Sequence, residues 1–369
     1  MAAYLLKRLL LVIPTLLGIM LFSFVIIQFA PGGPVERMIA IITQSDTGAT
    51  DRISGGGDGL AGGASNQATQ SGGVASKYRG AQGLDPEFIK ELEKQFGFDR
   101  PAHERFLLMM KNYLTFNFGN SYFRDTPVLE LIKQKMEVSI SLGVLMTLLT
   151  YLIAIPLGIR KAVHDGEKFD KWTSSILIVG YAIPGFLIGV LLLLLFAGSS
   201  FFQWFPSRGL TSEDYETFTF FGKIVDRAWH LVLPLTAIAL SAFTTTAFLT
   251  KNSFLDEIRK QYVITARAKG LTENKVLYGH VFRNAMLIVI AGFPGTFVTA
   301  FFTGSLLIEQ IFSLDGLGLL SYESIINRDY PVVFATLFIF SLMGLVIGIV
   351  TDFVYTLVDP RIDFESREV

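Results

Sequence analysis

The sequence predicts an all-α integral membrane protein with six transmembrane helices. Of its 369 residues, 51% are hydrophobic and only 17% are charged, whereas average soluble domains carry about 25% charged residues. The apolar residues gather in six long uncharged stretches. Only helices and closed barrels satisfy their backbone hydrogen bonds inside lipid, and barrel strands are only about 10 residues long. Stretches of this length are therefore expected to be helices.

Each stretch is long enough to cross the hydrocarbon core, which takes about 20 apolar residues. None contains Asp, Glu, Lys, Arg or His. Pro14, Pro156, Pro184 and Pro294 lie inside these stretches and are expected to kink their helices. The predicted spans are residues 9–30, 138–159, 176–196, 231–250, 285–308 and 331–351.

The lysines and arginines of the short loops orient these helices. The loops at 160–175 and 251–284 contain four and seven, whereas those at 197–230 and 309–330 contain three and one. Because basic short loops stay in the cytoplasm, both termini are expected there. The first span is too long for a cleavable signal peptide, and no A-x-A site follows it. We expect it to be retained.

Three regions follow from this topology. Residues 1–30 hold the N-terminus and the first transmembrane helix, 31–137 form an extracytoplasmic (periplasmic) insert, and 138–369 form a transmembrane core with the cytoplasmic loop 251–284. Within the insert, residues 48–83 contain eleven glycines. Such a segment buries too little apolar surface to offset its ordering entropy, so it is expected to be flexible.

Three amphipathic helices are expected in the rest of the insert. Asp85 and Pro86 are suited to begin the first, and Gly97 to end it. A second follows Pro101, with residues 106, 107, 110, 113 and 114 on its apolar face. A third begins at Thr126-Pro127 and runs into the second span. Two interpretations stay open: helices that simply pack on the bundle, and a docking surface for a partner.

Several chemistries are not encoded. The chain contains no cysteine, no G-x-x-x-x-G-K-[ST] phosphate loop and no H-E-x-x-H or G-x-S-x-G pattern. No catalytic residue and no metal site are therefore expected, and the chain is not expected to be an enzyme. A net charge of −1 argues against a nucleic-acid partner. The uncharged spans argue against an ion-driven carrier, while a passive channel stays open as an alternative.

The cytoplasmic loop 251–284 carries the most distinctive pattern. A short helix is expected there, with small residues Thr265, Ala266 and Ala268 that allow close approach of another protein. Gly270 is expected to end this helix in the left-handed conformation. The charges of Arg267 and Lys269 complement the helix terminus and an acidic partner. A juxtamembrane helix attracted to anionic lipid headgroups is the alternative.

Residues 262–285, with the pattern T-A-R-A-K-G-L…H…R-N-A, resemble the coupling loop of permeases of the dipeptide, oligopeptide and nickel class of ABC importers. In the general E-A-A…G motif of that loop, Ile264 occupies the glutamate position, Thr265 and Ala266 the alanines and Gly270 the glycine. Four further segments also resemble this family: 30–34 (A-P-G-G-P), 96–101 (F-G-F-D-R-P), 118–121 (F-G-N-S) and 309–318 (E-Q-I-F…G-L-G). The glycine-rich insert, with Gln310 and Asp315, resembles the Yej-type subfamily.

The resemblance implies a type I ABC importer permease fold and a permease subunit that moves peptides, including modified peptides, across the bacterial inner membrane by alternating access. The implied partners are a second homologous permease, two ATP-binding domains (separate or fused), a periplasmic peptide-binding protein, the peptide and the lipid bilayer. ATP and Mg would bind the ATPase subunits, so this chain itself is expected to hold no cofactor. The alternatives are a non-transporting membrane scaffold and an ABC exporter subunit.

The resemblance also implies two groups of site residues. The ATPase-coupling loop comprises Tyr262, Thr265, Ala266, Arg267, Ala268, Lys269, Gly270 and Leu271. The second group belongs to a family motif whose role the sequence leaves open: Glu309, Phe312, Gly316 and Gly318.

Overall fold

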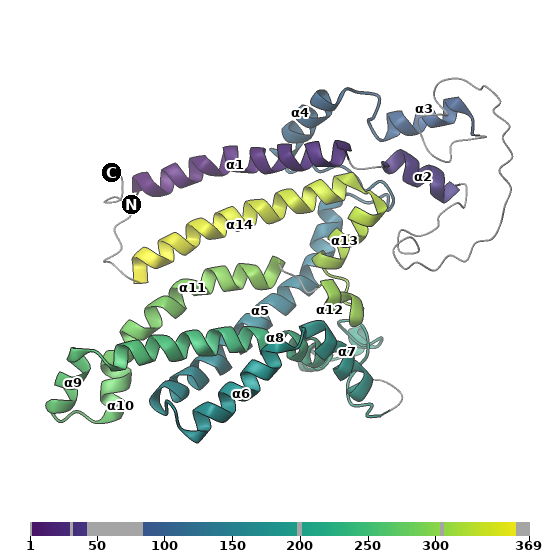
Figure 1. Cartoon of the computed structure of the whole chain (residues 1–369). Coiled ribbons are helices and arrows are strands. Elements are labelled where there is room, and N and C mark those ends of the chain that lie inside the picture. Colours follow the sequence, from purple (N-terminus) through teal and green to yellow (C-terminus); the bar gives the residue numbers. More distant parts are fainter. Residues whose placement is uncertain (1, 30–31, 43–83, 198–200, 303–305, 359–369) are drawn as a thin grey trace, which may run out of the picture. The chain divides into compact units, whose positions relative to one another are not determined.

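The computed structural model of the chain describes residues 2–29, 32–42, 84–197, 201–302 and 306–358, and this part of the chain is all-helical (Figure 1). A short π-helical turn, Leu277–Val281, precedes α11. The α-helices are α1 Ala2–Phe29, α2 Pro34–Ile42, α3 Pro86–Gln95, α4 Ala102–Tyr113, α5 Val128–Val163, α6 Lys168–Ala182, α7 Gly185–Phe196, α8 Phe220–Ile258, α9 Gln261–Ala268, α10 Glu273–Val276, α11 Phe282–Phe302, α12 Leu306–Ile311, α13 Leu317–Asn327 and α14 Tyr330–Val358.

Five helical stretches among the described residues are long and apolar enough to cross a membrane: α1, α5, α8, Glu273–Phe297 (α10, the π-helical turn and most of α11) and α14. The sixth predicted span is divided between α6 and α7, which meet at a bend of 95°. Ile183 there is extended, with φ −87° and ψ 123°, because Pro184 disfavours a helical residue before it and supplies no N–H of its own. The prediction of one kinked helix at 176–196 is therefore wrong, and six spans result only when the bent pair counts as one.

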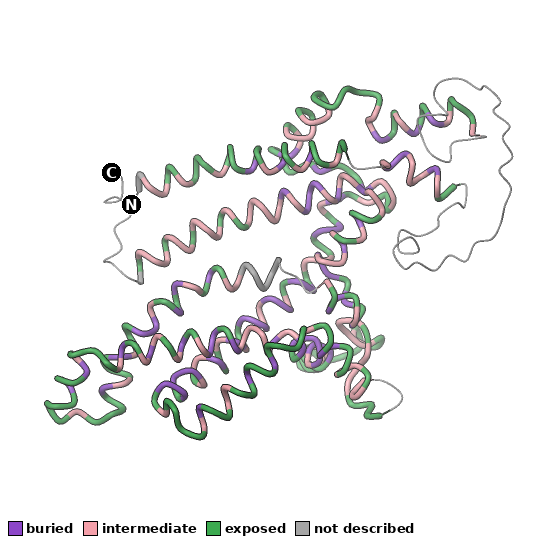
Figure 2. The backbone as a smooth tube through the Cα atoms, in the orientation of Figure 1, coloured by how far each residue is buried: buried purple, intermediate pink, exposed green. Residues whose placement is uncertain are grey.

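The other prolines leave their helices unbroken. Pro14, Pro156 and Pro294 lie inside α1, α5 and α11, and Pro234 lies inside α8. Burial differs strongly between the spans. In the most apolar stretch of α8, 50% of the residues are buried in the protein, against 17% for α1 (Figure 2). The surface of α1 is thus left for lipid or for another protein.

The described residues belong to two compact units. The transmembrane unit comprises Met1–Val12, Gln134–Leu320 and Leu342–Val369, and the insert unit comprises Ile13–Lys133 and Ser321–Ser341. The insert predicted at 31–137 therefore shares its unit with most of α1 and with parts of α13 and α14. The glycine-rich segment 48–83 lies outside the described residues.

Glycines allow close helix contacts in the transmembrane unit. A Cβ atom on Gly158 of α5 would lie 2.6 Å from the Thr250 Cβ atom of α8. A Cβ atom on Gly185 of α7 would lie 2.9 Å from the Ala237 carbonyl oxygen, also in α8. Because small residues let membrane helices approach each other closely, α8 packs tightly against both neighbours.

The insert unit has its own apolar cluster, formed by α2 and α3. Its buried members are Val35, Ile39, Ile89, Leu92 and Phe96. The predicted ends of α3 are confirmed: the Asp85 carboxylate accepts the Glu87 N–H at 2.9 Å, and Gly97 has a φ of +73°. The predicted third helix is also confirmed, since α5 begins at Val128 and continues into the second span.

Two features of the insert differ from the prediction. Helix α2 was not expected. In α4, Tyr113 is buried, but Leu107 and Leu114 of the predicted apolar face are 65% and 75% exposed. These two side chains do not contribute to the core of the unit.

Candidate functional site

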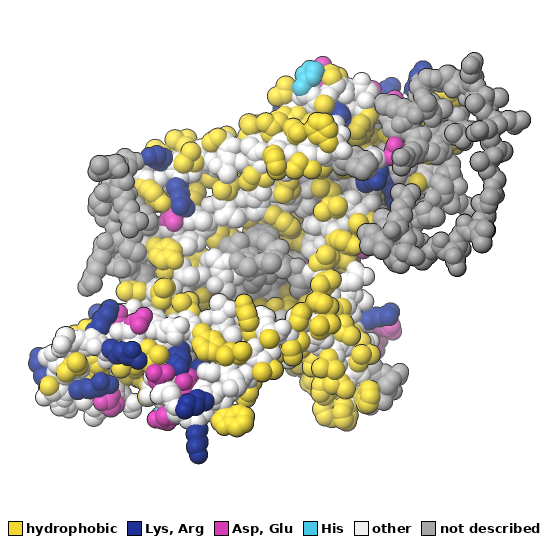
Figure 3. All heavy atoms as spheres, viewed as in Figure 1, with side chains coloured by type: hydrophobic (Ala, Val, Ile, Leu, Met, Phe, Trp, Pro, Cys, Tyr) yellow, Lys and Arg dark blue, Asp and Glu magenta, His cyan; other side chains and the backbone are white. Residues whose placement is uncertain are grey.

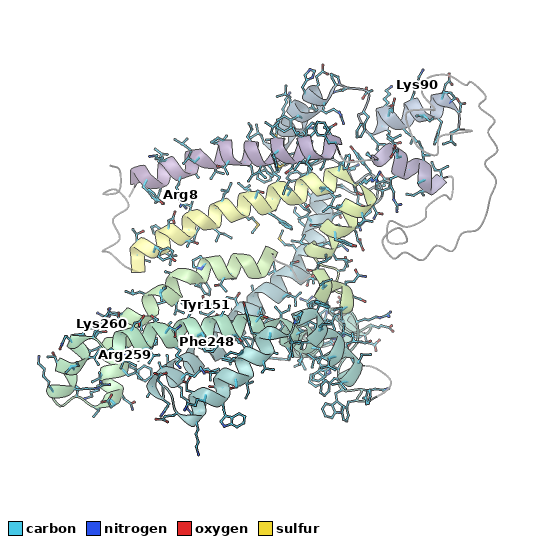
Figure 4. The ribbon with its side chains drawn as sticks, in the orientation of Figure 1. Arg8, Lys90, Tyr151, Phe248, Arg259 and Lys260 are labelled. Atoms are coloured by element: carbon cyan, nitrogen blue, oxygen red, sulfur yellow. The ribbon has the colours of Figure 1, made fainter. Side chains whose placement is uncertain are left out.

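Helix α9 is the short helix predicted in the loop 251–284, and a two-residue turn, Arg259-Lys260, joins it to α8 (Figure 4). Gly270 has a φ of +82°, and its N–H donates to the Arg267 carbonyl at 2.9 Å. The Leu271 N–H donates to the Ala266 carbonyl at 3.4 Å. The predicted left-handed stop is confirmed, since these bonds cap carbonyls of the last helical turn.

One face of α9 packs on its own chain. Val263 and Ala266 are buried and share an apolar cluster with Phe254 of α8, Val276 of α10 and Ala285 of α11. Ala266 was expected to face another protein, but its side chain is buried and lets α9 pack closely on α8, α10 and α11 of its own chain, so that prediction is wrong for Ala266. The exposed residues of α9 and its end are Gln261, Ile264, Thr265, Arg267, Ala268, Lys269 and Gly270.

Arg267 is paired within the chain. Its guanidinium donates to both carboxylate oxygens of Glu273 in α10, at 2.9 and 3.0 Å. An acidic partner would have to compete with Glu273 for this charge, whereas Lys269 is exposed. Leu271 packs against the cluster beneath α9. Figure 3 shows charged side chains of both signs gathered at the end of the transmembrane unit that carries α9 and α10.

An ionic network joins the neighbouring ends of α5, α6 and α8. Lys161 is completely buried, and its Nζ lies 3.0 Å from the Asp170 Oδ1. Lys251 of α8 bonds the other Asp170 oxygen at 2.7 Å and Asp165 at 2.9 Å. Lys161 also lies over the ring of Phe248, labelled in Figure 4. Because a buried charge is costly without its partner, this network links α8, and thereby α9, to the α5–α6 hairpin.

The motif at 309–318 has a structural role that the sequence left open. Glu309 is completely buried, and its Oε2 accepts the Leu319 N–H at 2.7 Å, at the start of α13. A Cβ atom on Gly316 would lie 2.6 Å from the Glu309 Cδ, and one on Gly318 would lie 3.1 Å from its Oε2. The glycines thus make room for a carboxylate that caps a helix. Phe312 is buried in the core of the unit.

The Glu309 carboxyl is only partly satisfied. Its Oε1 has no hydrogen-bond partner among the described residues. Burial raises the pKa of this carboxyl above its ordinary value, and the charge of Asp315 acts in the same direction, while the N–H groups of Leu319 and Gly318 oppose the shift. The group binds a proton more readily than an exposed glutamate does.

Asp329, which the sequence analysis missed, is the hydrogen-bond acceptor for the end of the F-G-N-S motif. Its carboxylate accepts hydrogen bonds from the Ser121 hydroxyl and, at 3.0 Å, from the Tyr122 N–H. The Ser121 Oγ in turn accepts the N–H groups of Phe123 and Arg124 at 3.3 and 3.1 Å. Asp329 is 2% exposed and directly precedes α14. An aspartate just before Tyr330-Pro331 and a long apolar run is a helix-start signal that could have identified it.

Comparison with known proteins identifies the family. Residues 154–364 match the family described as the inner membrane component of binding-protein-dependent transport systems. The chain belongs to this family. The location of this permease in an inner membrane is thereby confirmed, and the relatives below confirm the resemblance to permeases of peptide-class ABC importers.

Relatives of this permease match it over its whole length. It is 64% identical to the peptidoglycan transport system permease protein YejB of Agrobacterium fabrum and 55% identical to the inner membrane ABC transporter permease protein YejB of Escherichia coli O157:H7, with all of each chain covered. It is 33% identical to the oligopeptide transport system permease protein AppB of Bacillus subtilis, over 99% of this chain and 100% of that protein. The predicted similarity to the Yej-type subfamily is confirmed.

The glycine cradle of this permease predicts a specific stability effect. Gly316→Ala is expected to destabilise it by about 1–3 kcal/mol, because the new methyl group overlaps the buried Glu309 carboxyl. Gly318→Ala, with a longer approach, is the milder control. Thermal unfolding of the purified permease measures both. In a Glu309→Ala background the effect of Gly316→Ala should shrink; full additivity of the two changes would contradict the cradle.

Proposed function

We propose that this chain is a permease subunit of an ATP-driven importer that carries peptides, including modified peptides, across the bacterial inner membrane. The observation that carries this proposal is the full-length similarity to permeases whose names specify transport of oligopeptides and peptidoglycan. The uncharged interiors of the spans suit this role, since a path for peptides of varied sequence should not bind any one side chain tightly.

The partners in this proposal are a second homologous permease, two ATP-binding domains (separate or fused) and a periplasmic peptide-binding protein. The chain has no phosphate loop, so the energy comes from the ATP-binding partners, which hold ATP and Mg. The exposed face of α9 is the proposed docking site, with Ile264 (51% exposed), Thr265, Ala268 and Lys269. The chain itself holds no cofactor and carries out no catalysis.

Transport in this proposal proceeds by alternating access. Movement of the ATP-binding domains shifts α9, and its buried contacts with α8, α10 and α11 pass the shift to the transmembrane unit. The network around Lys161, Asp170 and Lys251 extends it to α5 and α6. Packed elements that move as rigid bodies are the usual means of such transitions.

Reconstitution tests the proposal. The permease should co-purify with its partner permease and with ATP-binding subunits, and the complex in vesicles should accumulate peptide when ATP and the binding protein are present. Peptide movement in the opposite direction would support the exporter alternative. A complex in which peptide neither moves nor stimulates ATP hydrolysis would support the scaffold alternative.

In the proposed orientation, both termini and α9 lie in the cytoplasm and the insert lies in the periplasm. Arg8 of α1 forms an ion pair with Asp352 of α14, so the N-terminal end of α1 lies beside the C-terminal part of α14 (Figure 4). This pairing supports a common side for the two termini.

Cysteine labelling in intact spheroplasts checks this orientation. The parent chain has no cysteine, so it serves as the unlabelled control. A membrane-impermeant maleimide should label Lys90→Cys in α3 and should not label Asn274→Cys in α10 until the membrane is permeabilised. Both positions are exposed, so access to the side chain does not limit either reaction. The reverse labelling pattern would invert the topology and remove α9 from the ATP-binding subunits.

A further inference from the structure

We infer that Tyr262, held between Glu257 and Asn284, is a positioning residue that orients α9 against α8 and α11 and thereby determines how much peptide is moved per ATP hydrolysed. This inference rests on the proposed function and extends it from the docking face of α9 to the joint behind it.

One phenol connects three helices at this joint. The Tyr262 hydroxyl donates to the Glu257 Oε2 at 2.6 Å and accepts from the Asn284 Nδ2 at 3.2 Å. Glu257 lies in the last turn of α8, Tyr262 in the first turn of α9 and Asn284 in the first turn of α11. The Tyr262 hydroxyl thus acts as donor to one helix and as acceptor from another, which a tyrosine can do and a phenylalanine cannot.

The carboxylate at the centre of the joint is itself held in place. Glu257 is only 9% exposed, and its Oε1 accepts a hydrogen bond from Lys260, in the turn between α8 and α9. Each Glu257 oxygen therefore has a different partner, one in the turn and one in α9. A hydrogen bond to an ionised acceptor is stronger than one between neutral groups, so this contact is suited to resist a rotation of α9.

Apolar packing alone does not supply that resistance. Val263 and Ala266 attach α9 to the cluster beneath it, but hydrophobic contact is non-directional and allows a short helix to rotate or slide while it stays buried. The link from α8 to α9 is only Arg259-Lys260. Directional hydrogen bonds fix the helix rotation, so that a push on the exposed face reaches α8 and α11 rather than being lost in movement of α9.

The test uses Tyr262→Phe in the assembled complex, reconstituted in vesicles with its ATP-binding subunits and binding protein. Phenylalanine keeps the ring and loses both hydrogen bonds. We expect unchanged co-purification of the ATP-binding subunits and continued ATP hydrolysis, but roughly a five- to tenfold fall in peptide accumulated per ATP hydrolysed. A role in folding alone would lower the amount of complex without changing this ratio.

Two further variants sharpen the result. Ser253→Ala is the matched control, because it removes a bond between α8 and α11, from the Ser253 hydroxyl to the Ala285 carbonyl at 2.6 Å, without involving α9. It should keep the parent ratio. Glu257→Gln keeps a neutral acceptor for the phenol and should lower the ratio less than Tyr262→Phe does.

The outcomes separate this inference from the proposed function. If the parent complex lacks ATP-binding subunits, the proposed function fails and the inference fails with it. If the parent complex contains them and couples, but Tyr262→Phe moves as much peptide per ATP as the parent, only the inference is overturned. An equal fall in Ser253→Ala would also overturn it, because the effect would then belong to any contact near α8 and α11.

Discussion

Gly270→Val is expected to lower peptide uptake at least tenfold while the permease still inserts and pairs with its partner. Gly270 has a φ of +82°, and beyond Gly270 and its two chain neighbours no heavy atom lies within 4 Å of the position that a Cβ would take. The effect is therefore one of backbone conformation rather than of space. A β-branched residue in this region costs about 1–3 kcal/mol, and the relief of that strain unwinds the end of α9.

Matched variants at Gly270 separate conformation from side-chain chemistry. Asparagine tolerates positive φ better than other side chains do, so Gly270→Asn should keep most of the uptake, and Gly270→Ala should fall between the two. Uptake of a labelled peptide and co-purification of the ATP-binding subunits are the measurements. If Gly270→Val showed the same peptide uptake and the same co-purification of the ATP-binding subunits as the parent, α9 would be a connector at the lipid headgroups rather than a coupling helix.

Asp329→Ala is expected to cause the largest loss of stability, about 3 kcal/mol. The change leaves the buried Ser121 hydroxyl and the Tyr122 N–H without their acceptor, and each unsatisfied buried group costs about 1–3 kcal/mol. It also removes the side chain that precedes α14. Thermal unfolding of the purified permease should show the loss. Ser121→Ala, which removes one partner and keeps the carboxylate, should cost less; equal losses would contradict a central role for Asp329.

The pH dependence of this site has a defined sign. Burial raises the pKa of the Asp329 carboxyl, although the bonds from Ser121 and Tyr122 oppose the shift. The folded state then binds the proton more tightly than the unfolded state, so the stability from this group is fully present below the ordinary pKa of about 4 and is lost as pH rises through the folded pKa. Asp329→Asn cannot titrate. Its Tm relative to that of the parent should therefore rise as the pH is raised above about 4.

Features governed by neighbouring residues could be predicted from the sequence. The apolar spans, the start of α3 at Asp85, its end near Gly97 and the left-handed stop at Gly270 all follow from residues within one or two helical turns. Backbone preferences and side-chain caps act over that range whatever the rest of the chain does. The family motifs were recognisable for the same reason, since each is a short run of residues.

The tertiary structure alone decided what those motifs do. Asp329 bonds Ser121, which is 208 positions away in the sequence. The Glu309 carboxyl occupies the space that side chains at Gly316 and Gly318 would fill. Lys161, which counts as a loop charge in the sequence, is completely buried beside Asp170. Ala266 faces its own chain.

The bend at Pro184 is also a feature that the tertiary structure decided. Its residue chemistry predicts a disturbance, but a proline permits either a kinked helix that continues or a break, and α5, α8 and α11 continue past theirs. Packing selects between the two, since freed carbonyls are tolerated only where neighbouring groups satisfy them. The sequence by itself thus determined most of the helical segments, although not α2 or the break at Pro184, and where several of them stop. Which face of a helix is buried, and which distant group satisfies each buried charge, depended on contacts that exist only once the helices are packed together.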